Sequence, residues 1–220
     1  MQDDKFYDLL ESPRIKRDIK SRTINKEKNR ILASKFDRDY FDGSRETGYG
    51  GYKYDGRWIP IAKKIIKKFN LKENDKFLDV GCAKGFLMHD MHNLSSGKIN
   101  VNGIEISDYA INLSMPSIKN KILKGNCKRL PFGDKEFNFT CAINTIHNLE
   151  LEDCIESIKE IQRVSKQSFI QVDAYRNKAE YDIFIDWMLT AKTFLMPQEW
   201  KKLFRKCNYS GYYFWTILEV

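Results

Sequence analysis

The sequence predicts a doubly wound α/β fold, in which a mostly parallel sheet carries helices on both faces, preceded by an N-terminal extension of helical and aromatic character. Three observations lead to this prediction. From residue 76 onward, short apolar segments alternate with amphipathic segments. A glycine-containing turn, 81–85, joins the first pair of segments. Residues 1–58 lack this alternation and are rich in charged, aromatic and glycine residues.

The N-terminal extension divides into two parts. Residues 1–40 are strongly charged and weakly periodic, which predicts either one or two surface helices that cap the domain or a partly mobile arm. Residues 40–58 contain too many glycines for regular structure and too many aromatic side chains for an ordinary solvated loop. We therefore expect 1–58 to be an extension that ends in an aromatic, glycine-rich lid, and 59–220 to be the main domain.

The main domain begins with a helix opened by Pro60, whose apolar residues recur at helical spacing. The expected strands are 76–80, 99–106, 121–124, 137–144, 168–173 and 212–218. The expected helices between them are 86–94, 109–115, 151–164, 179–192 and 197–207. Strands that alternate with helices form parallel units, and ligands bind such sheets at the carboxyl ends of the strands.

Composition limits the function classes. Lys and Arg outnumber Asp and Glu by 38 to 30, a formal net charge of +8, but acidic residues are interleaved with the basic ones. We therefore do not expect a nucleic-acid partner. No apolar run reaches the roughly 18 residues of a membrane span, and the charged start Met1–Lys5 lacks a signal-peptide core. The sequence predicts a cytoplasmic protein without a membrane span.

The positions of cysteine and histidine favour neither disulfides nor a metal centre. The five cysteines are scattered and form no C-x-x-C pair, which fits a reducing compartment. His89 and His92 can share a helix face, but no third ligand follows at a recognisable spacing. No metal is expected.

One segment carries most of the functional signal. Leu78–Phe86 (LDVGCAKGF) predicts a strand that runs through a tight turn into a helix. Gly81 permits the sharp turn, and Gly85 permits close approach of the backbone to a ligand. Glu105 ends the next strand about 20 residues later, where an acidic side chain can bind both hydroxyls of a ribose. The combination indicates a cofactor that contains adenosine.

At this point the sequence resembles the class I S-adenosylmethionine-dependent methyltransferases, in particular their type 11 and type 25 domains, whose first motif reads D/E-x-G-x-G-x-G. Here that motif is DVGCAKG, from Asp79 to Gly85. The resemblance continues in register through GIEIS at 103–107, GNC at 125–127, LPF at 130–132 and QEWKKLF at 198–204. It implies a Rossmann-like methyltransferase fold, with S-adenosyl-L-methionine as cofactor and S-adenosyl-L-homocysteine as product.

The resemblance also implies cofactor contacts, residue by residue. The expected contacts lie in the glycine turn and at the following strand ends: Asp79, Gly81, Cys82, Ala83, Gly85, Glu105, Ile106, Asn126, Cys127 and Asn144. Three features depart from the family's pattern. Ala83 replaces the central glycine, and Asn126 replaces the common aspartate that meets the adenine amine. A single strand follows the last helix, where the family usually has an antiparallel pair.

Candidate residues for the methyl acceptor come from the lid and from the later strand ends. The expected substrate-binding residues are Tyr49, Tyr52, Tyr54, Arg57, Trp58, Asp173 and Tyr175. Aromatic side chains among them can close over the cofactor or cage a cationic acceptor. His147, just past the fourth strand, is the candidate catalytic base, and the alternative is a loop histidine with a local hydrogen bond. Trp187, Trp200 and Trp215 are expected in the core or in helix packing.

These expectations favour a transferase that moves a methyl group from S-adenosylmethionine to a small-molecule acceptor by in-line displacement. Two alternatives stay open: an RNA or protein methyltransferase that uses the basic arm 14–38, and a non-catalytic module that binds an adenosyl ligand. An NAD-dependent oxidoreductase fits worse, because the glycine spacing differs from a dinucleotide fingerprint. We expect a monomer or homodimer, and the residues do not specify the acceptor or the atom methylated.

Overall fold

The computed structural model describes residues 5–11 and 19–218. Within this range, the sheet has six strands in the order β3-β2-β1-β4-β5-β6, and every neighbouring pair is parallel. The strands are β1 (Lys76–Val80), β2 (Asn100–Glu105), β3 (Ile122–Lys124), β4 (Phe137–Ile143), β5 (Ser165–Asp173) and β6 (Tyr212–Thr216). The predicted doubly wound α/β fold is confirmed.

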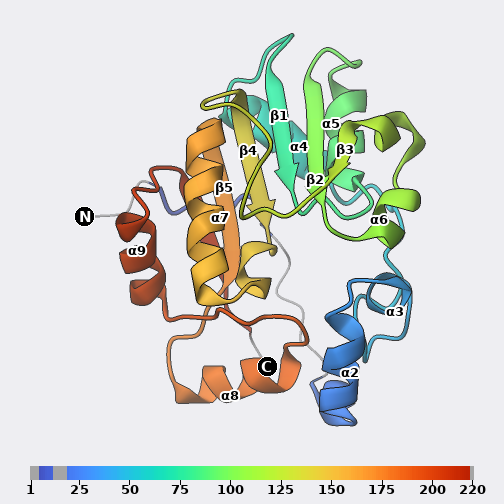
Figure 1. Ribbon diagram of the computed structural model, residues 1–220, viewed down its shortest axis with the longest axis vertical. Coiled ribbons are helices and arrows are strands. Elements are labelled where there is room, and N and C mark those ends of the chain that lie inside the picture. Colours follow the sequence, from blue (N-terminus) through green and yellow to red (C-terminus); the bar gives the residue numbers. More distant parts are fainter. Residues whose placement is uncertain (1–4, 12–18, 219–220) are drawn as a thin grey trace.

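Helices cover both faces of this sheet (Figure 1). The helices in the described part of the chain are α1 (Lys20–Thr23), α2 (Lys26–Ala33), α3 (Arg38–Phe41), α4 (Ile59–Lys68), α5 (Phe86–Leu94), α6 (Asp108–Asn112), α7 (Leu151–Val164), α8 (Lys178–Trp187) and α9 (Pro197–Lys206). Two 3₁₀ helices are η1 (Pro116–Lys121) and η2 (Ile146–Asn148). Figure 1 also shows α2, α3 and α8 beyond the carboxyl ends of the strands, the edge at which parallel sheets bind ligands.

Alternation along the strands divides the apolar core into two layers. On β1, Phe77 belongs to the layer that contains Ile65 of α4, whereas its neighbour Leu78 belongs to the layer of Ile158 and Trp200 from α7 and α9. All five side chains are fully buried. Each large apolar side chain buried in this way contributes about 1.5–3 kcal/mol, so each layer fixes one face of the sheet to its own helices.

The predicted bounds 76–80, 86–94 and 151–164 are those of β1, α5 and α7. The helix expected over 179–192 instead ends at Trp187. Beyond it the chain turns back to η2, where the N–H groups of Lys192 and Thr193 both donate to the carbonyl of His147 at 3.0 Å. These bonds replace the helical hydrogen bonds and bring the segment after α8 to the edge of the sheet.

The outer edge of β6 is continued by the N-terminal extension. Phe6 forms a parallel bridge with Tyr213, and the N–H of Tyr7 donates to the carbonyl of Tyr213 at 3.0 Å. The Phe6 ring packs against Trp215, with ring centroids 4.5 Å apart. The single strand expected after the last helix is confirmed, and residues of the extension lie at the edge beside it.

Candidate functional site

The turn after β1 contains three residues with left-handed backbone. The φ angle is +77° at Gly81, +51° at Ala83 and +71° at Gly85. A Cβ atom on Gly81 would lie 2.4 Å from the side chain of Thr145, and one on Gly85 would lie 2.4 Å from Cδ1 of Ile118. Both glycines are therefore required by backbone conformation and by packing, and Gly85, just before α5, allows close packing against Ile118 of η1.

Ala83 occupies a conformation that glycine would adopt freely. A left-handed backbone costs a residue with a side chain about 1 kcal/mol. The N–H of Ala83 donates to Oε2 of Glu105 at 2.8 Å, and this bond offsets part of the strain. The turn is thereby fastened to the end of β2.

Glu105 uses both carboxylate oxygens to hold this turn. Oε1 accepts the N–H groups of Ile106 and Ser107, both at 2.8 Å, while Oε2 accepts the N–H of Ala83. Burial raises the pKa of Glu105, and the three hydrogen bonds oppose that rise. A carboxylate has about four lone-pair sites, and three of those on Glu105 already accept backbone N–H groups. To accept hydrogen bonds from two ligand hydroxyls, Glu105 therefore has to give up one of its backbone hydrogen bonds.

Asp79 lies on β1 directly before this turn, and its side chain is buried. Burial raises the pKa of Asp79 to about 7, an effect that the hydrogen bond from Cys141 opposes and the charge of Glu105 reinforces. The Cys141 thiol lies 3.6 Å from Oδ1 of Asp79. Near neutral pH the carboxyl group is therefore close to its midpoint, and a charged ligand nearby can change its protonation.

A cleft of about 130 Å³ opens at the turn, walled also by the ends of β2, β3 and β4. Seven of the predicted cofactor residues line it: Gly81, Ala83, Glu105, Ile106, Asn126, Cys127 and Asn144. The other three, Asp79, Cys82 and Gly85, are buried and do not belong to its wall. We call this space the cofactor cleft.

Aromatic residues of the N-terminal extension complete the cofactor cleft. Phe36, Tyr40, Phe41 and Tyr49 all line it. The rings of Tyr40, Phe41 and Tyr49 pack together, with centroids 5.1 to 6.1 Å apart. Of these residues the sequence singled out Tyr49 alone, although Tyr40 and Phe41 begin the aromatic stretch that it predicted as a lid. We call these four residues the aromatic cover.

One ion pair fastens the aromatic cover to the glycine turn. Nζ of Lys84 lies 2.6 Å from Oδ2 of Asp42 and donates to the carbonyl of Tyr52 at 2.9 Å. Asp42 also accepts the hydroxyl of Tyr109 at 2.8 Å. Burial acts to raise the pKa of Asp42, but the hydrogen bonds from Lys84, Tyr109 and the Tyr52 N–H hold it below its ordinary value. We call this contact the Asp42–Lys84 anchor.

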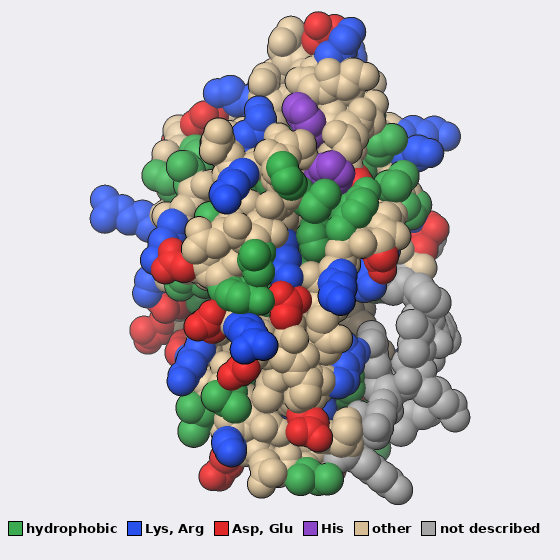
Figure 2. Space-filling view, turned by 90° about the vertical axis from the view of Figure 1, so that its right-hand side faces the viewer, with side chains coloured by type: hydrophobic (Ala, Val, Ile, Leu, Met, Phe, Trp, Pro, Cys, Tyr) green, Lys and Arg blue, Asp and Glu red, His purple; other side chains and the backbone are tan. Residues whose placement is uncertain are grey.

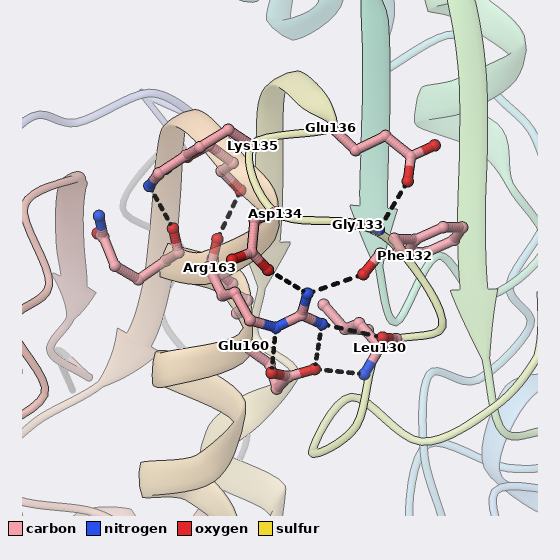
Figure 3. Close-up of polar contacts among 11 residues, drawn as sticks. Leu130, Phe132, Gly133, Asp134, Lys135, Glu136, Glu160 and Arg163 are labelled. Atoms are coloured by element: carbon pink, nitrogen blue, oxygen red, sulfur yellow. Dashed lines mark hydrogen bonds and ion pairs between the residues drawn. The ribbon is translucent and has the colours of Figure 1, made fainter.

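The other side of the cofactor cleft is formed by the loop 125–136, between β3 and β4. Figure 3 shows Arg163 of α7 pointing into this loop. The guanidinium donates to the carbonyls of Leu130 and Phe132 at 3.1 and 2.8 Å, and to the carboxylate of Asp134 at 2.8 Å. The loop, which begins with the predicted adenine contacts, is therefore tied to a core helix.

Glu160 completes this arrangement, which we call the Arg163 network. Arg163 makes a two-pronged contact with Glu160 at 2.6 and 2.8 Å, and Glu160 accepts the N–H of Leu130 at 2.7 Å (Figure 3). The hydrogen bond from Arg163 holds the pKa of Glu160 below its ordinary value. Paired arginine–carboxylate bonds are strong and directional, so the network favours one loop conformation.

A larger cavity of about 730 Å³ lies next to the cofactor cleft. The two spaces share four lining residues: Tyr40, Tyr49, Asn144 and Asn148. The remaining walls come mainly from the ends of β5 and β6, the segment after α8, and arginines of the extension. Its volume falls within the range of small-molecule sites, roughly 300–1,000 Å³. A small molecule in this large cavity would lie beside a ligand in the cofactor cleft.

The large cavity contains some of the predicted substrate-binding residues. It is lined by Tyr49, Arg57 and Asp173. It is not lined by Tyr52, Tyr54, Trp58 or Tyr175. Tyr52 and Tyr54 pack on α5 instead: Tyr52 stacks on Phe86 with centroids 4.8 Å apart, and the Tyr54 hydroxyl donates to Asp90 at 2.6 Å. The remaining two pack against neighbouring apolar or aromatic side chains.

The three tryptophans that were expected in the core or in helix packing lie in different surroundings. Trp200 is fully buried, and Trp215 packs against the same core cluster, as expected. Trp215 and Trp187, the last residue of α8, also line the large cavity. Contacts with Arg22 explain why Trp187 lies at the cavity. The guanidinium carbon of Arg22 lies 3.8 Å from the indole centroid, and the guanidinium donates to the Trp187 carbonyl at 3.2 Å. No local sequence pattern links residues so far apart in the chain.

His147 is buried, and its ring faces Asp173. Nδ1 accepts the N–H of Asp173 at 3.2 Å, and Nε2 lies 3.6 Å from Oδ2 of the same residue. Because Nδ1 accepts, the proton of the neutral ring lies on Nε2. Burial lowers the pKa of His147, an effect that the Asp173 charge opposes. The ring has no lone pair left for a substrate, so this arrangement favours a positioning role for His147.

Within residues 5–11 and 19–218, no group of three or more His, Cys, Asp or Glu side chains could hold a metal ion. Nor does any helix in that part of the chain have the length and apolar character needed to cross a membrane. The cysteines are buried and unpaired, and burial raises the pKa of Cys82 and Cys141. Such thiols are poor nucleophiles.

Comparisons with known proteins agree with this geometry. A methyltransferase domain family model matches residues 78–168. Sterol 4-C-methyltransferase strm-1 of Caenorhabditis elegans is 31% identical over 141 residues, which cover 59% of this chain and 41% of that protein. Demethylmenaquinone methyltransferase of Staphylococcus saprophyticus is 24% identical over 139 residues, which cover 61% of this chain and 59% of that protein. The chain thus spans about half the length of these curated relatives.

Solved structures share the fold. The YcgJ protein of Bacillus subtilis superposes with a TM-score of 0.55 at 16% identity, over 66% of each chain. The [4+2]-cyclase SpnF has a TM-score of 0.55 at 16% identity, over 68% of this chain and 57% of its own. The glycine turn, the acid that ends β2 and the six-stranded sheet accord with these matches. The matched methyltransferase domain at residues 78–168 and the shared Rossmann-like fold together support a class I S-adenosylmethionine-dependent methyltransferase.

Proposed function

We propose that this protein transfers a methyl group from S-adenosylmethionine to a small-molecule acceptor held in the large cavity. One observation carries the proposal: the cofactor cleft and the large cavity share Tyr40, Tyr49, Asn144 and Asn148. The bound cofactor would supply an already electrophilic methyl group. The protein then has to align the acceptor and exclude water, and the aromatic cover is placed to do both.

The residues of the cofactor cleft fit this cofactor. Glu105 presents a buried carboxylate at the end of β2, the position for the ribose hydroxyls. Asn126 lies in the same wall, and although its Oδ1 accepts the N–H of Lys128 at 3.0 Å, a second lone pair stays available for an adenine amine. Asp79, close to its midpoint near neutral pH, can respond to the charged amino-acid end.

The two curated relatives favour a small acceptor, since one is named a sterol methyltransferase and the other a demethylmenaquinone methyltransferase. The structural neighbour named as a [4+2]-cyclase shows that this fold also serves other chemistry. The proposal therefore has to be tested by turnover as well as by binding.

The described part of the basic arm does not favour an RNA substrate. Arg22 is 7% exposed and donates to the carbonyls of Arg45, Gly48 and Trp187. On the face shown in Figure 2, basic and acidic side chains are interspersed. An RNA-binding surface usually gathers its positive charge along one face. The non-catalytic alternative differs from the proposal by turnover alone.

Within the large cavity, we assign proton uptake to Asp173 and its positioning to His147. The geometry of His147 supports this division, because both ring nitrogens face Asp173. A base is needed only for acceptors that lose a proton during transfer. His147→Gln, which can still contact the Asp173 backbone, is expected to retain more activity than His147→Leu on such acceptors.

The first test is titration calorimetry with S-adenosylmethionine, S-adenosylhomocysteine and NAD, on protein freed of co-purified ligand. We expect binding of the two sulfur ligands and none of NAD. Glu105→Gln keeps the shape but loses the charge, and should weaken S-adenosylhomocysteine binding about 10- to 100-fold, in line with 1–3 kcal/mol for a charged hydrogen bond. Glu73→Gln, at an exposed ion pair with Lys98, is the matched control. Equal affinities in both variants would refute the assignment of the cofactor cleft.

A further inference from the structure

The large cavity contains an acceptor atom without a donor. Oε1 of Gln171 is buried and has no hydrogen-bond partner among the described residues, while Nε2 donates to Oγ1 of Thr216 at 3.1 Å. Gln171 is 3% exposed and lines the large cavity. The other buried side-chain atoms that lack partners in the described part belong to residues outside both cavity walls. Because a buried unpaired carbonyl is costly, this atom is suited to a donor supplied by a ligand.

Gln171 lies near Asp173, whose carboxylate lines the same cavity. Gln171 and Asp173 lie two residues apart on β5, so their side chains leave the sheet on the same face. In the sheet register Gln171 lies opposite Phe214 of β6, and Asp173 lies opposite Thr216. The cavity wall at β5 therefore presents two hydrogen-bond acceptors, on Gln171 and Asp173, next to the ring of Phe214. A bound molecule can reach both acceptors with a donor group at one of its ends.

The rest of the cavity suits a flat apolar body. Six aromatic residues line it: Phe6, Tyr40, Tyr49, Trp187, Phe214 and Trp215. Aromatic walls bind planar rings by stacked and edge-on contacts. With about 730 Å³, the cavity has room for a molecule of two or more fused rings.

Charge in the cavity favours a neutral donor over a cationic one. Arg22, Arg45, Arg57 and Arg176 all line it. Arg22 and Arg45 donate to backbone carbonyls, and Arg57 and Arg176 make ion pairs with carboxylates within their own segments. These contacts fix the guanidinium groups in the wall. The carboxylates of Asp8, Asp55, Asp173 and Glu180 balance these four charges in number, so the wall offers an ammonium ligand no net negative charge, whereas a neutral hydroxyl group needs none.

We propose that Gln171 selects the methyl acceptor: a neutral hydroxyl group on a planar aromatic body donates to Oε1 of Gln171, an assignment of substrate class that rests on the proposed function. The hydroxyl group of such a phenol-like ligand contacts the hydrogen-bond acceptors on β5, and its ring contacts the aromatic residues of the cavity wall. An ether or a ketone at the same position leaves the buried carbonyl unpaired and binds less well.

The test uses 2-naphthol and 2-methoxynaphthalene, which share the ring system and differ in the donor. Dissociation constants are measured by ligand-observed NMR with and without S-adenosylhomocysteine. We expect the wild-type protein to prefer 2-naphthol about tenfold, a difference of about 1.4 kcal/mol. Gln171→Met should remove the preference. Gln167→Met, the same change on the same strand and outside the cavity wall, should keep it.

A further variant and the S-adenosylhomocysteine arm of the test keep the outcomes distinct. If Gln171→Met does not fold, Thr216→Val serves instead, because it releases the amide from its partner and should reduce the preference two- to fivefold. Binding of neither probe, equal binding of both by the wild-type protein, or a preference that survives Gln171→Met overturns the inference. If S-adenosylhomocysteine does not bind but the 2-naphthol preference depends on Gln171, the proposed function fails and recognition by Gln171 stands.

Discussion

The two sides of the cofactor cleft are held by different means. On one side, the Arg163 network ties the loop 125–136 to α7 through five donor contacts from one guanidinium. On the other side, the aromatic cover is held by ring packing and by the Asp42–Lys84 anchor. The Arg163 network holds a loop that connects two strands of the sheet, β3 and β4. The Asp42–Lys84 anchor holds part of the extension, which lies outside the sheet.

This difference separates the part of the cleft that is built in advance from the part that can open. A loop fixed by directional charged bonds presents its ligand contacts without further ordering. The cover lies outside the sheet and is held by one ion pair, by ring packing and by hydrogen bonds from Arg22, Arg45 and Tyr109. We therefore expect it to open more readily than the loop, as local openings of proteins do. Ligand entry is therefore expected on the side of the aromatic cover.

The largest expected effect is on the pH dependence of the free energy of unfolding. Asp79, on the strand between the two sides of the cleft, should change this free energy in the opposite sense to the carboxylates of the two sides. The pKa of Asp79 is raised to about 7 in the folded chain, so between about 4 and 7 the folded state holds a proton that the unfolded state has lost. Stability falls as pH rises through this window, by at most about 4 kcal/mol. Urea unfolding at several pH values should show this fall, and Asp79→Asn should flatten it.

The carboxylates on the two sides act in the opposite sense. The pKa values of Asp42 and Glu160 are lowered in the folded chain, so their contribution is present above the ordinary carboxyl range and is lost as pH falls below it. Asp79→Asn should leave this acid limb unchanged. A pH profile of Asp79→Asn that matches the wild-type profile would contradict the assignment.

The next largest effect concerns the loop side. Arg163→Ala removes five donor contacts and leaves the carbonyls of Leu130 and Phe132 without this donor. At about 0.5–1.5 kcal/mol for each bond, and with partial exposure of Arg163, we expect the free energy of unfolding to fall by about 3 kcal/mol. Arg205→Ala, at an exposed position of α9, is the control. Equal losses in both variants would show that the network does not stabilise the loop.

The cover side should show a smaller loss of stability and a clearer loss of affinity. In a double-mutant cycle of Lys84→Met and Asp42→Asn, we expect a coupling energy of about 1–2 kcal/mol. Lys84→Met should also weaken S-adenosylhomocysteine binding about tenfold, because the cover is no longer fastened to the turn. Lys64→Met, which breaks an ion pair with Glu11 away from both cavities, should leave that affinity unchanged. Additive effects in the cycle would rule out the anchor.

The smallest effect lies where the two sides meet, at Ala83. Ala83→Gly relieves the left-handed backbone, worth about 1 kcal/mol, but gives the unfolded chain more freedom, worth about 0.5–1 kcal/mol. The free energy of unfolding should rise by less than about 1 kcal/mol, with S-adenosylhomocysteine affinity unchanged within about twofold. A clear loss of stability would show that the alanine methyl group packs favourably.

The sequence predicts which residues gather around the cofactor cleft, because these residues follow strand ends. Gly81, Glu105, Asn126 and Asn144 each lie just beyond a periodic apolar run, and in a parallel sheet such positions gather at one edge. Local pattern and tertiary position coincide there. The same logic places Asp173 correctly at the end of β5.

The large cavity is less predictable, because its walls come from segments without a shared local pattern. Gln171 lies inside a strand, and its unpaired carbonyl depends on the contact with Thr216 from β6. Trp187 faces the cavity because Arg22, from the charged arm, stacks on it. Tyr52 and Tyr54 were expected at the substrate, yet α5 offers them a ring and a carboxylate to pack against. Such pairings depend on tertiary contacts that spacing does not encode.

The bridge between Phe6 and Tyr213 has a consequence for how the chain reaches this structure. Its two partners are about 200 residues apart in the sequence, so a ribosome that adds 5–20 residues per second delivers the second partner about 10–40 s after the first. Through that interval the rings of Phe6 and Tyr7 have no β6 to pack against. The sheet edge therefore closes late, and the nascent chain exposes this aromatic segment until β6 has been synthesised.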